Sequence, residues 1–118
     1  MIVVDSNSVK SVPLADEIVA KGPVNRRPLI DTKTTGGFGV ALVTFSPGAK
    51  LNFHVHDSEQ ILYVTEGKGV IATKEKEYVI TPGCIVFIPA GEAHMHGATG
   101  NTSLTHLAIQ KVGIKLAK

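Results

Sequence analysis

Five histidines could contribute to a metal site. His54 and His56 lie two residues apart on a segment expected to be extended, so strand alternation places both imidazoles on one face. Neutral imidazole nitrogens bind divalent transition metals, and two of them on one strand can meet the same ion without backbone strain. This His-x-His unit predicts one half of a metal site.

The remaining donors must come from other segments. Gln60 has the same strand parity as His56, whereas Glu59 has the opposite parity and is expected to be a solvated or more distant charge. His94 follows a turn formed by residues 89–91. A third imidazole and an oxygen donor would complete a four-donor protein shell, and an octahedral ion would keep positions open for water or substrate.

Two further histidines have roles that the spacing leaves open. His96 shares the parity of His94 and either faces the site or only braces its loop by hydrogen bonding. His106 falls on the last predicted strand, where we expect it to line the pocket. Gln110 shares the parity of His106 and would face the same way.

Short strands must position these side chains. Twelve glycines and six prolines punctuate runs rich in Val, Ile, Thr, Phe and Tyr, which is typical of a small β-sandwich or barrel. The predicted strands are Phe38–Phe45, Gln60–Thr65, Gly69–Thr73, Glu77–Ile80, Cys84–Ile88 and Ser103–Gln110. Leu14–Lys21 fits a short helix, a strand or an irregular arm equally well. Residues 23–35 are expected to wrap the barrel or to mediate self-association.

Composition excludes several classes of protein. The chain has 118 residues, 43% hydrophobic and 19% charged, with a formal net charge of +2. This indicates one globular domain and gives no electrostatic case for binding nucleic acid or a membrane surface. The absence of Trp argues against a base-stacking platform. The single cysteine, Cys84, makes a reducing cytoplasm the expected location.

Two spaced motifs resemble those of the cupin family. Gly48-(x5)-His54-x-His56-(x3)-Gln60-(x6)-Gly67 resembles the first cupin motif, and Gly83-(x5)-Pro89-x-Gly91-(x2)-His94 resembles the second. The resemblance implies an all-β fold, a cupin-type double-stranded β-helix or jelly-roll barrel. Residues 1–35 would form an N-terminal arm with edge strands and one short helix, and residues 36–118 the barrel. It also implies four metal ligands: His54, His56, Gln60 and His94.

The sequence departs from the general cupin pattern in an informative way. The fourth ligand position is usually Glu, and Asn often ends the second motif, where this chain has Ala98. Gln at the fourth position is normal in a narrower group that the chain also resembles. That group comprises small bacterial cupins associated with carboxymuconolactone decarboxylase-like proteins and the manganese-dependent cupin hydroxynitrile lyases. It commonly has Trp where this chain has Met95 and Phe53.

The resemblance implies an enzyme of lyase, isomerase or decarboxylase type that acts on a small oxygenated substrate, with cyanohydrin cleavage as one instance. His106 would move a proton, assuming a pKa near neutrality, with Gln110 and His96 as further catalytic residues. Ala41, Val43 and Leu51 would form an apolar wall.

The cofactor would be one divalent transition metal. Manganese or iron is favoured, with zinc, nickel, cobalt or copper as alternatives. A cupin dioxygenase using iron or copper and a non-enzymatic small-ligand-binding cupin are the competing hypotheses. Open strand edges suggest a homodimer.

Overall fold

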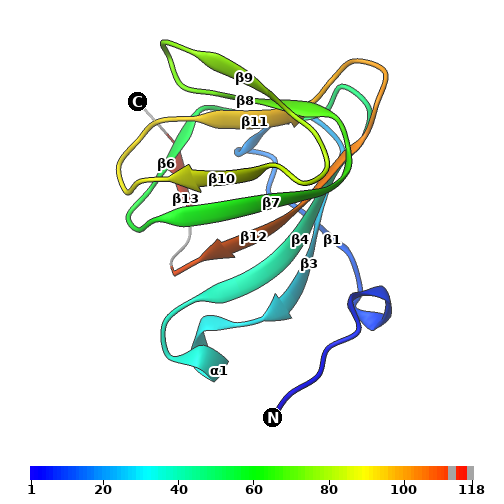
Figure 1. The fold of residues 1–118 in the computed structure, drawn as a ribbon, viewed down its shortest axis with the longest axis vertical. Helices are drawn as coiled ribbons and strands as arrows, with labels where there is room; N and C mark the ends of the chain where they lie inside the picture. Colours follow the sequence, from blue (N-terminus) through cyan, green and yellow to red (C-terminus); the bar gives the residue numbers. More distant parts are fainter. Residues whose placement is uncertain (112–113, 117–118) are drawn as a thin grey trace.

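Runs of β-branched and aromatic residues between Gly and Pro turns pair into antiparallel sheets, and Figure 1 shows the two large ones wrapping around a common interior. The computed structural model describes residues 1–111 and 114–116. The six-stranded sheet has the order β1 (Val12–Pro13), β3 (Val24–Ile30), β4 (Gly39–Phe45), β12 (Leu104–Gln110), β7 (Gln60–Gly67) and β10 (Ile85–Ile88). The five-stranded sheet has the order β2 (Val19–Lys21), β5 (Lys50–Leu51), β11 (Met95–Ala98), β8 (Gly69–Ala72) and β9 (Glu77–Ile80). A third, two-stranded sheet pairs β6 (His54–His56) with β13 (Ile114–Leu116).

The all-β prediction is confirmed, and the six predicted strands are all present, with ends that shift by no more than two residues. The segment Leu14–Lys21 is a turn followed by β2, not a helix. Ile18 is buried there, and β2 pairs with β5. The helical pieces lie elsewhere, as a single 3-10 turn at Ser6–Ser8 and the short α1 at Thr32–Thr35. No helix in the described part of the chain has the length and apolar character needed to span a bilayer.

The N-terminal segment contributes to the main sheet. Strand β3 pairs with β4 from Val24 to Ile30, and β1 continues the sheet beyond β3. Residues 23–35 therefore follow the barrel wall, which is one of the two roles expected for them from the sequence. The division of the chain at residue 35 stays a prediction.

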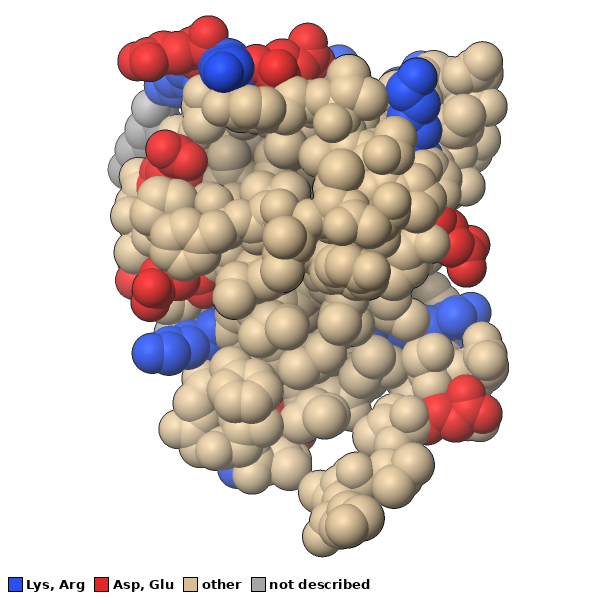
Figure 2. Space-filling model, viewed as in Figure 1, with Lys and Arg blue, Asp and Glu red and all other residues tan. Residues whose placement is uncertain are grey.

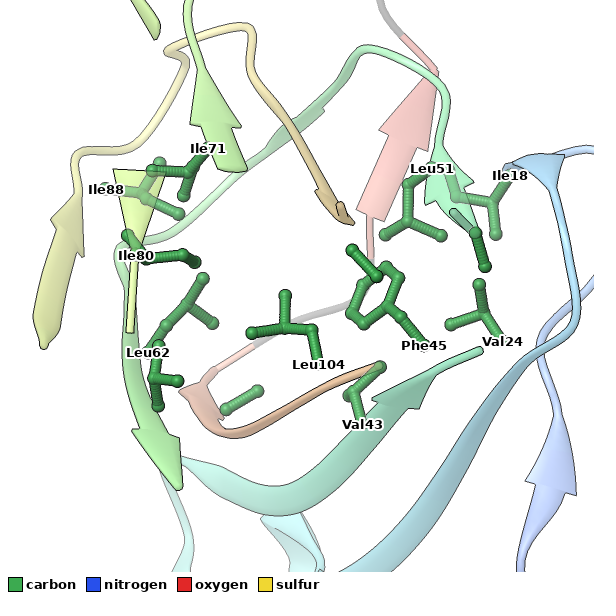
Figure 3. Close-up of a cluster of buried hydrophobic side chains, with 14 residues drawn as sticks. Ile18, Val24, Val43, Phe45, Leu51, Leu62, Ile71, Ile80, Ile88 and Leu104 are labelled. Atoms are coloured by element: carbon green, nitrogen blue, oxygen red, sulfur yellow. The ribbon is translucent and has the colours of Figure 1, made fainter. Parts of the chain in front are cut away.

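The barrel interior is divided into an apolar part and a polar part. The apolar part is a cluster of buried side chains in which Figure 3 shows Phe45 and Leu104 between two outer groups. Ile71, Ile80 and Ile88 lie to one side, and Ile18, Val24 and Leu51 lie to the other. The buried polar residues are His54, His56, Gln60, His94, His96 and His106. Buried polar side chains at this density require hydrogen-bond partners or a ligand, so the polar part is the candidate site.

Candidate metal centre

Three histidines from two distant segments meet in the barrel interior. His54 and His56 are the first and last residues of β6, and both are buried because both point inward. His94 lies just before β11 and is joined to His54 by two backbone hydrogen bonds, His54 N–H to His94 O at 2.9 Å and the reverse at 3.0 Å. One nitrogen from each of the three rings lies within 4.8 Å of the others. This arrangement could hold a metal ion.

Hydrogen bonds to the backbone orient two of these rings. Nδ1 of His54 lies 2.7 Å from the carbonyl oxygen of Asn52, and Nδ1 of His94 lies 2.9 Å from that of Glu92. A carbonyl only accepts, so each Nδ1 carries the proton and each Nε2 keeps its lone pair. Both Nε2 atoms are buried and have no hydrogen-bond partner among the described residues. Such buried lone pairs are costly unless something occupies the space between them, which fits a metal ion.

Gln60 adds an oxygen donor to the same interior. It begins β7 and is buried, whereas Glu59 is exposed, as strand parity predicted. Its Nε2 donates a hydrogen bond to Oε1 of Gln110 on the neighbouring strand β12. Because the amide nitrogen is held in this way, Oε1 is the free end, and it is buried with no partner in the described structure. The geometry fits Gln60 as a fourth donor, and its role as a ligand stays a prediction.

Burial favours the neutral form of two of these histidines, His54 and His94. It lowers the pKa of His54 from 6.5 to about 4, an effect only partly offset by the Asn52 carbonyl. Burial likewise lowers the pKa of His94, against the raising effect of the Glu92 carbonyl. Neutral imidazole is the form that binds metal, so protons compete poorly for these two nitrogens at pH 7.

His96 and His106 form a second histidine pair beside the first group. Both are buried, and a hydrogen bond of 2.9 Å joins Nδ1 of His96 to Nε2 of His106. The Phe45 ring packs against both, with centroids 5.6 and 5.5 Å away. Burial lowers the pKa of His106 to about 4 and that of His96 well below 6.5. The expected near-neutral pKa of His106 is therefore wrong, because a sequence gives no measure of desolvation.

These residues open onto a cavity of about 630 Å³ along the inner face of the six-stranded sheet. His54, His56, Gln60, His96, His106 and Gln110 all line it. Ala41, Val43 and Leu51 supply the expected apolar wall. Arg26, Asp31 and Lys111 also line the cavity, and the sequence analysis did not predict this. Strand parity would have found Arg26 had Val24–Ile30 been recognised as a strand paired with β4.

Comparison with known proteins identifies the class. The cupin domain family matches residues 41–110, and the chain belongs to this family. It is 42% identical over 92 residues to the (R)-mandelonitrile lyase of Granulicella tundricola, covering 76% of this chain and 70% of that protein. It is 36% identical over 70 residues to an oxalate-binding protein of Thermotoga maritima, covering 58% of each. A crystal structure of a cupin-like protein from Thermotoga maritima matches with a TM-score of 0.86 at 27% identity, covering 96% of this chain and 89% of that one.

Proposed function

We propose that this protein is a metal-dependent cupin enzyme of lyase type acting on a small oxygenated molecule. The observation that carries the proposal is the convergence of three buried histidines, His54, His56 and His94, with one nitrogen of each ring within 4.8 Å of the others. The 42% identity to a mandelonitrile lyase favours cleavage of a cyanohydrin or a related hydroxy compound. An isomerase or decarboxylase would use the same site. The reducing cytosol is the location that fits the single cysteine.

The proposed ligand set, three imidazoles and one amide oxygen, carries no negative charge. A divalent ion held there would keep its full charge and supply Lewis acidity toward an oxygen of the substrate. Coulomb interactions strengthen as the local dielectric falls, so the buried site favours anionic ligands and ligands that become anionic. We favour manganese or iron, with zinc, nickel, cobalt or copper as alternatives.

The His96–His106 pair is suited to move a proton without accumulating charge. Two neutral imidazoles share one hydrogen bond, so of the two outer nitrogens, His96 Nε2 and His106 Nδ1, one carries a proton and the other a lone pair. The pair can take a proton at one outer nitrogen and release one from the other, and both rings stay neutral. For a cyanohydrin, the hydroxyl proton would pass to this pair as the bond between the hydroxyl-bearing carbon and the nitrile carbon breaks. The products would be an aldehyde and cyanide.

The test is an assay of mandelonitrile cleavage by protein loaded with a defined metal. We expect His106→Ala to lower kcat at least tenfold while elemental analysis shows unchanged metal content. Unchanged turnover would remove His106 as a proton carrier. Absence of cleavage by the metal-loaded wild-type protein would contradict the assignment of this reaction.

A second candidate is a small-ligand-binding cupin without catalysis. The similarity to an oxalate-binding protein favours this alternative. Calorimetric titration with oxalate separates the two hypotheses, because tight binding without turnover of any hydroxy compound would favour the binding protein.

A further inference from the structure

An arginine faces the cavity. Arg26 lies on β3, where its register partner on β4 is Val43, and both residues line the cavity. In the part of the chain that the structure describes, its side chain makes no hydrogen bond and no ion pair. Arg27, the next residue, belongs to the opposite face of the same strand and does not line the cavity.

The other charged groups at the cavity leave it cationic. Lys111 lies at its edge, just beyond the end of β12. Asp31 also lines it, but its carboxylate accepts hydrogen bonds of 2.8 Å from the backbone N–H and the hydroxyl of Thr34, which hold its pKa low. Asp31 is thus occupied in capping α1. Arg26 has five N–H donors and can bind a planar carboxylate through two parallel hydrogen bonds.

Sheet register gives the approximate separation of the backbones of Arg26 and His106. Arg26 pairs with Val43, and Val43 pairs with His106, so the three residues form one row on the cavity side of β3, β4 and β12, from an exposed arginine to a buried histidine. Strands are spaced at about 4.8 Å, which puts the backbones of Arg26 and His106 about 10 Å apart. A molecule of a few carbon atoms can reach both ends of this row.

We propose that Arg26 is a carboxylate-binding residue, and that the physiological substrate is a small carboxylic acid whose reacting oxygen lies at the histidine end of the cavity. This inference rests on the proposed function for the location of the chemistry. It makes cleavage of a neutral cyanohydrin a secondary activity, because such a molecule carries no group that uses the positive charge of Arg26. The neutral metal-ligand set favours the same anionic substrate class.

Calorimetric titration with mandelate and mandelamide tests the proposal, since these probes differ only in the charged group. We expect Arg26→Met to weaken mandelate binding at least tenfold and to change mandelamide binding less than twofold. Arg27→Met is the matched control, which removes the same charge from the other face and should leave both affinities within twofold of wild type.

The same titrations on metal-free protein separate this inference from the proposed function. The effect of Arg26→Met should persist there, because Arg26 is not among the proposed metal ligands. If elemental analysis shows that the protein binds no metal, the proposed function fails while the Arg26 effect can still be measured. Equal losses in Arg26→Met and Arg27→Met, an unchanged mandelate affinity in Arg26→Met, or no mandelate binding by wild type would overturn the carboxylate site.

A separate observation concerns the outer face of the six-stranded sheet. Ile61 and Tyr63 on β7 pair in register with Phe87 and Ile85 on β10, and the four side chains are 37–71% exposed. Half-buried apolar residues continue the same face on β12 and β4: Leu107, Ile109, Leu42 and Val40. Figure 2 shows a broad area without Lys, Arg, Asp or Glu across the middle of the molecule, where β7, β10 and β12 run, with charged side chains at its edges. We call the four exposed residues the outer patch.

We propose that the outer patch binds a second copy of this chain. Its four side chains expose roughly 400 Å² of apolar surface, within the range of about 300–600 Å² for the largest apolar patch on a monomer, which is often functional. That is about half of the ~800 Å² that each partner buries in a stable interface. The outer patch would form the apolar core of such an interface, and the polar residues around it would form the rim. An uncharged face produces no like-charge repulsion when it meets its own copy across a two-fold axis.

Light scattering coupled to size-exclusion chromatography tests this interface. We expect the wild type to elute as a dimer and the double variant Ile85→Glu, Phe87→Glu as a folded monomer, with folding checked by circular dichroism. Val79→Glu is the control, because Val79 is 61% exposed on β9 of the other sheet and its replacement should leave the dimer intact. A monomeric wild type, or a double variant that stays dimeric, would contradict the proposal.

Discussion

Gln60 is the residue on which the four-donor site depends. Its amide nitrogen is held by Gln110, which leaves its buried oxygen as the atom that would serve as the proposed fourth donor. Its neighbour Glu59 would be the stronger ligand by charge, but it lies on the exposed side of the chain. If Gln60 is the fourth ligand, as proposed, the use of a neutral donor in place of an anionic one follows from strand alternation.

Replacing each of these two neighbours with alanine tests the ligand assignment. Gln60→Ala should lower the affinity for a divalent ion by tenfold or more, since it removes a proposed donor and leaves three imidazoles. Glu59→Ala should leave affinity unchanged, because the exposed carboxylate contacts solvent. Competition with a metal indicator dye measures both. If Glu59→Ala lost the metal while Gln60→Ala retained it, the register of this segment would be wrong by one residue.

At the level of elements, the connection between β7 and β8 holds the barrel wall close to the loop before β12. Gly67 has a positive φ of 80°, and a β-carbon there would overlap the carbonyl oxygen of Ser103. Lys68 N–H donates a hydrogen bond of 3.0 Å to the same oxygen. The glycine is required both for its backbone conformation and for this close approach.

A pair of glycine substitutions separates these two requirements. We expect Gly67→Ala to lower the free energy of unfolding by more than about 2 kcal/mol, since it adds a steric clash to an unfavourable φ. Gly83→Ala should cost only about 1 kcal/mol, because Gly83 has a φ of 96° but no described atom within 4 Å of an added β-carbon. Urea unfolding measures both, and equal losses would show that close packing at Gly67 is unimportant.

For the molecule as a whole, the buried histidines link stability to pH. The pKa of His106 falls from 6.5 to about 4 because of burial, and that of His54 falls similarly. Between these pH values the unfolded chain binds protons that the folded chain does not, so stability declines as pH falls. Above about pH 6.5 both states are neutral at these residues, and the dependence disappears.

This predicts a defined acid transition in the metal-free protein. Its free energy of unfolding should decrease from pH 6.5 to pH 4 by about 1.4 kcal/mol per pH unit for each histidine kept neutral by folding. His106→Asn should show a shallower slope, because one such group is missing. Urea unfolding at a series of pH values measures the slope, and a flat profile in the wild type would contradict the buried neutral state.

The sequence was sufficient for the all-β class and for most strand positions. Gly and Pro set the turns, and β-branched runs between them have few alternatives to pairing as strands. It was insufficient at Leu14–Lys21, where eight residues carry too weak a local preference and pairing of β2 with β5 decides the conformation.

The shared orientation of His54 and His56 was determined by the sequence alone, since side-chain direction in a strand alternates with residue number. Gln60 lies beyond a bend at residues 57–58, and the packing of β7 decided that its side chain faces the same interior. The meeting of His54 and His56 with His94 was decided by tertiary structure, through a backbone bridge between segments 40 residues apart. The pairing of His96 with His106, the low pKa of His106 and the position of Arg26 beside the cavity were decided in the same way. Each depends on what lies opposite a side chain after folding, and local periodicity carries no information about that.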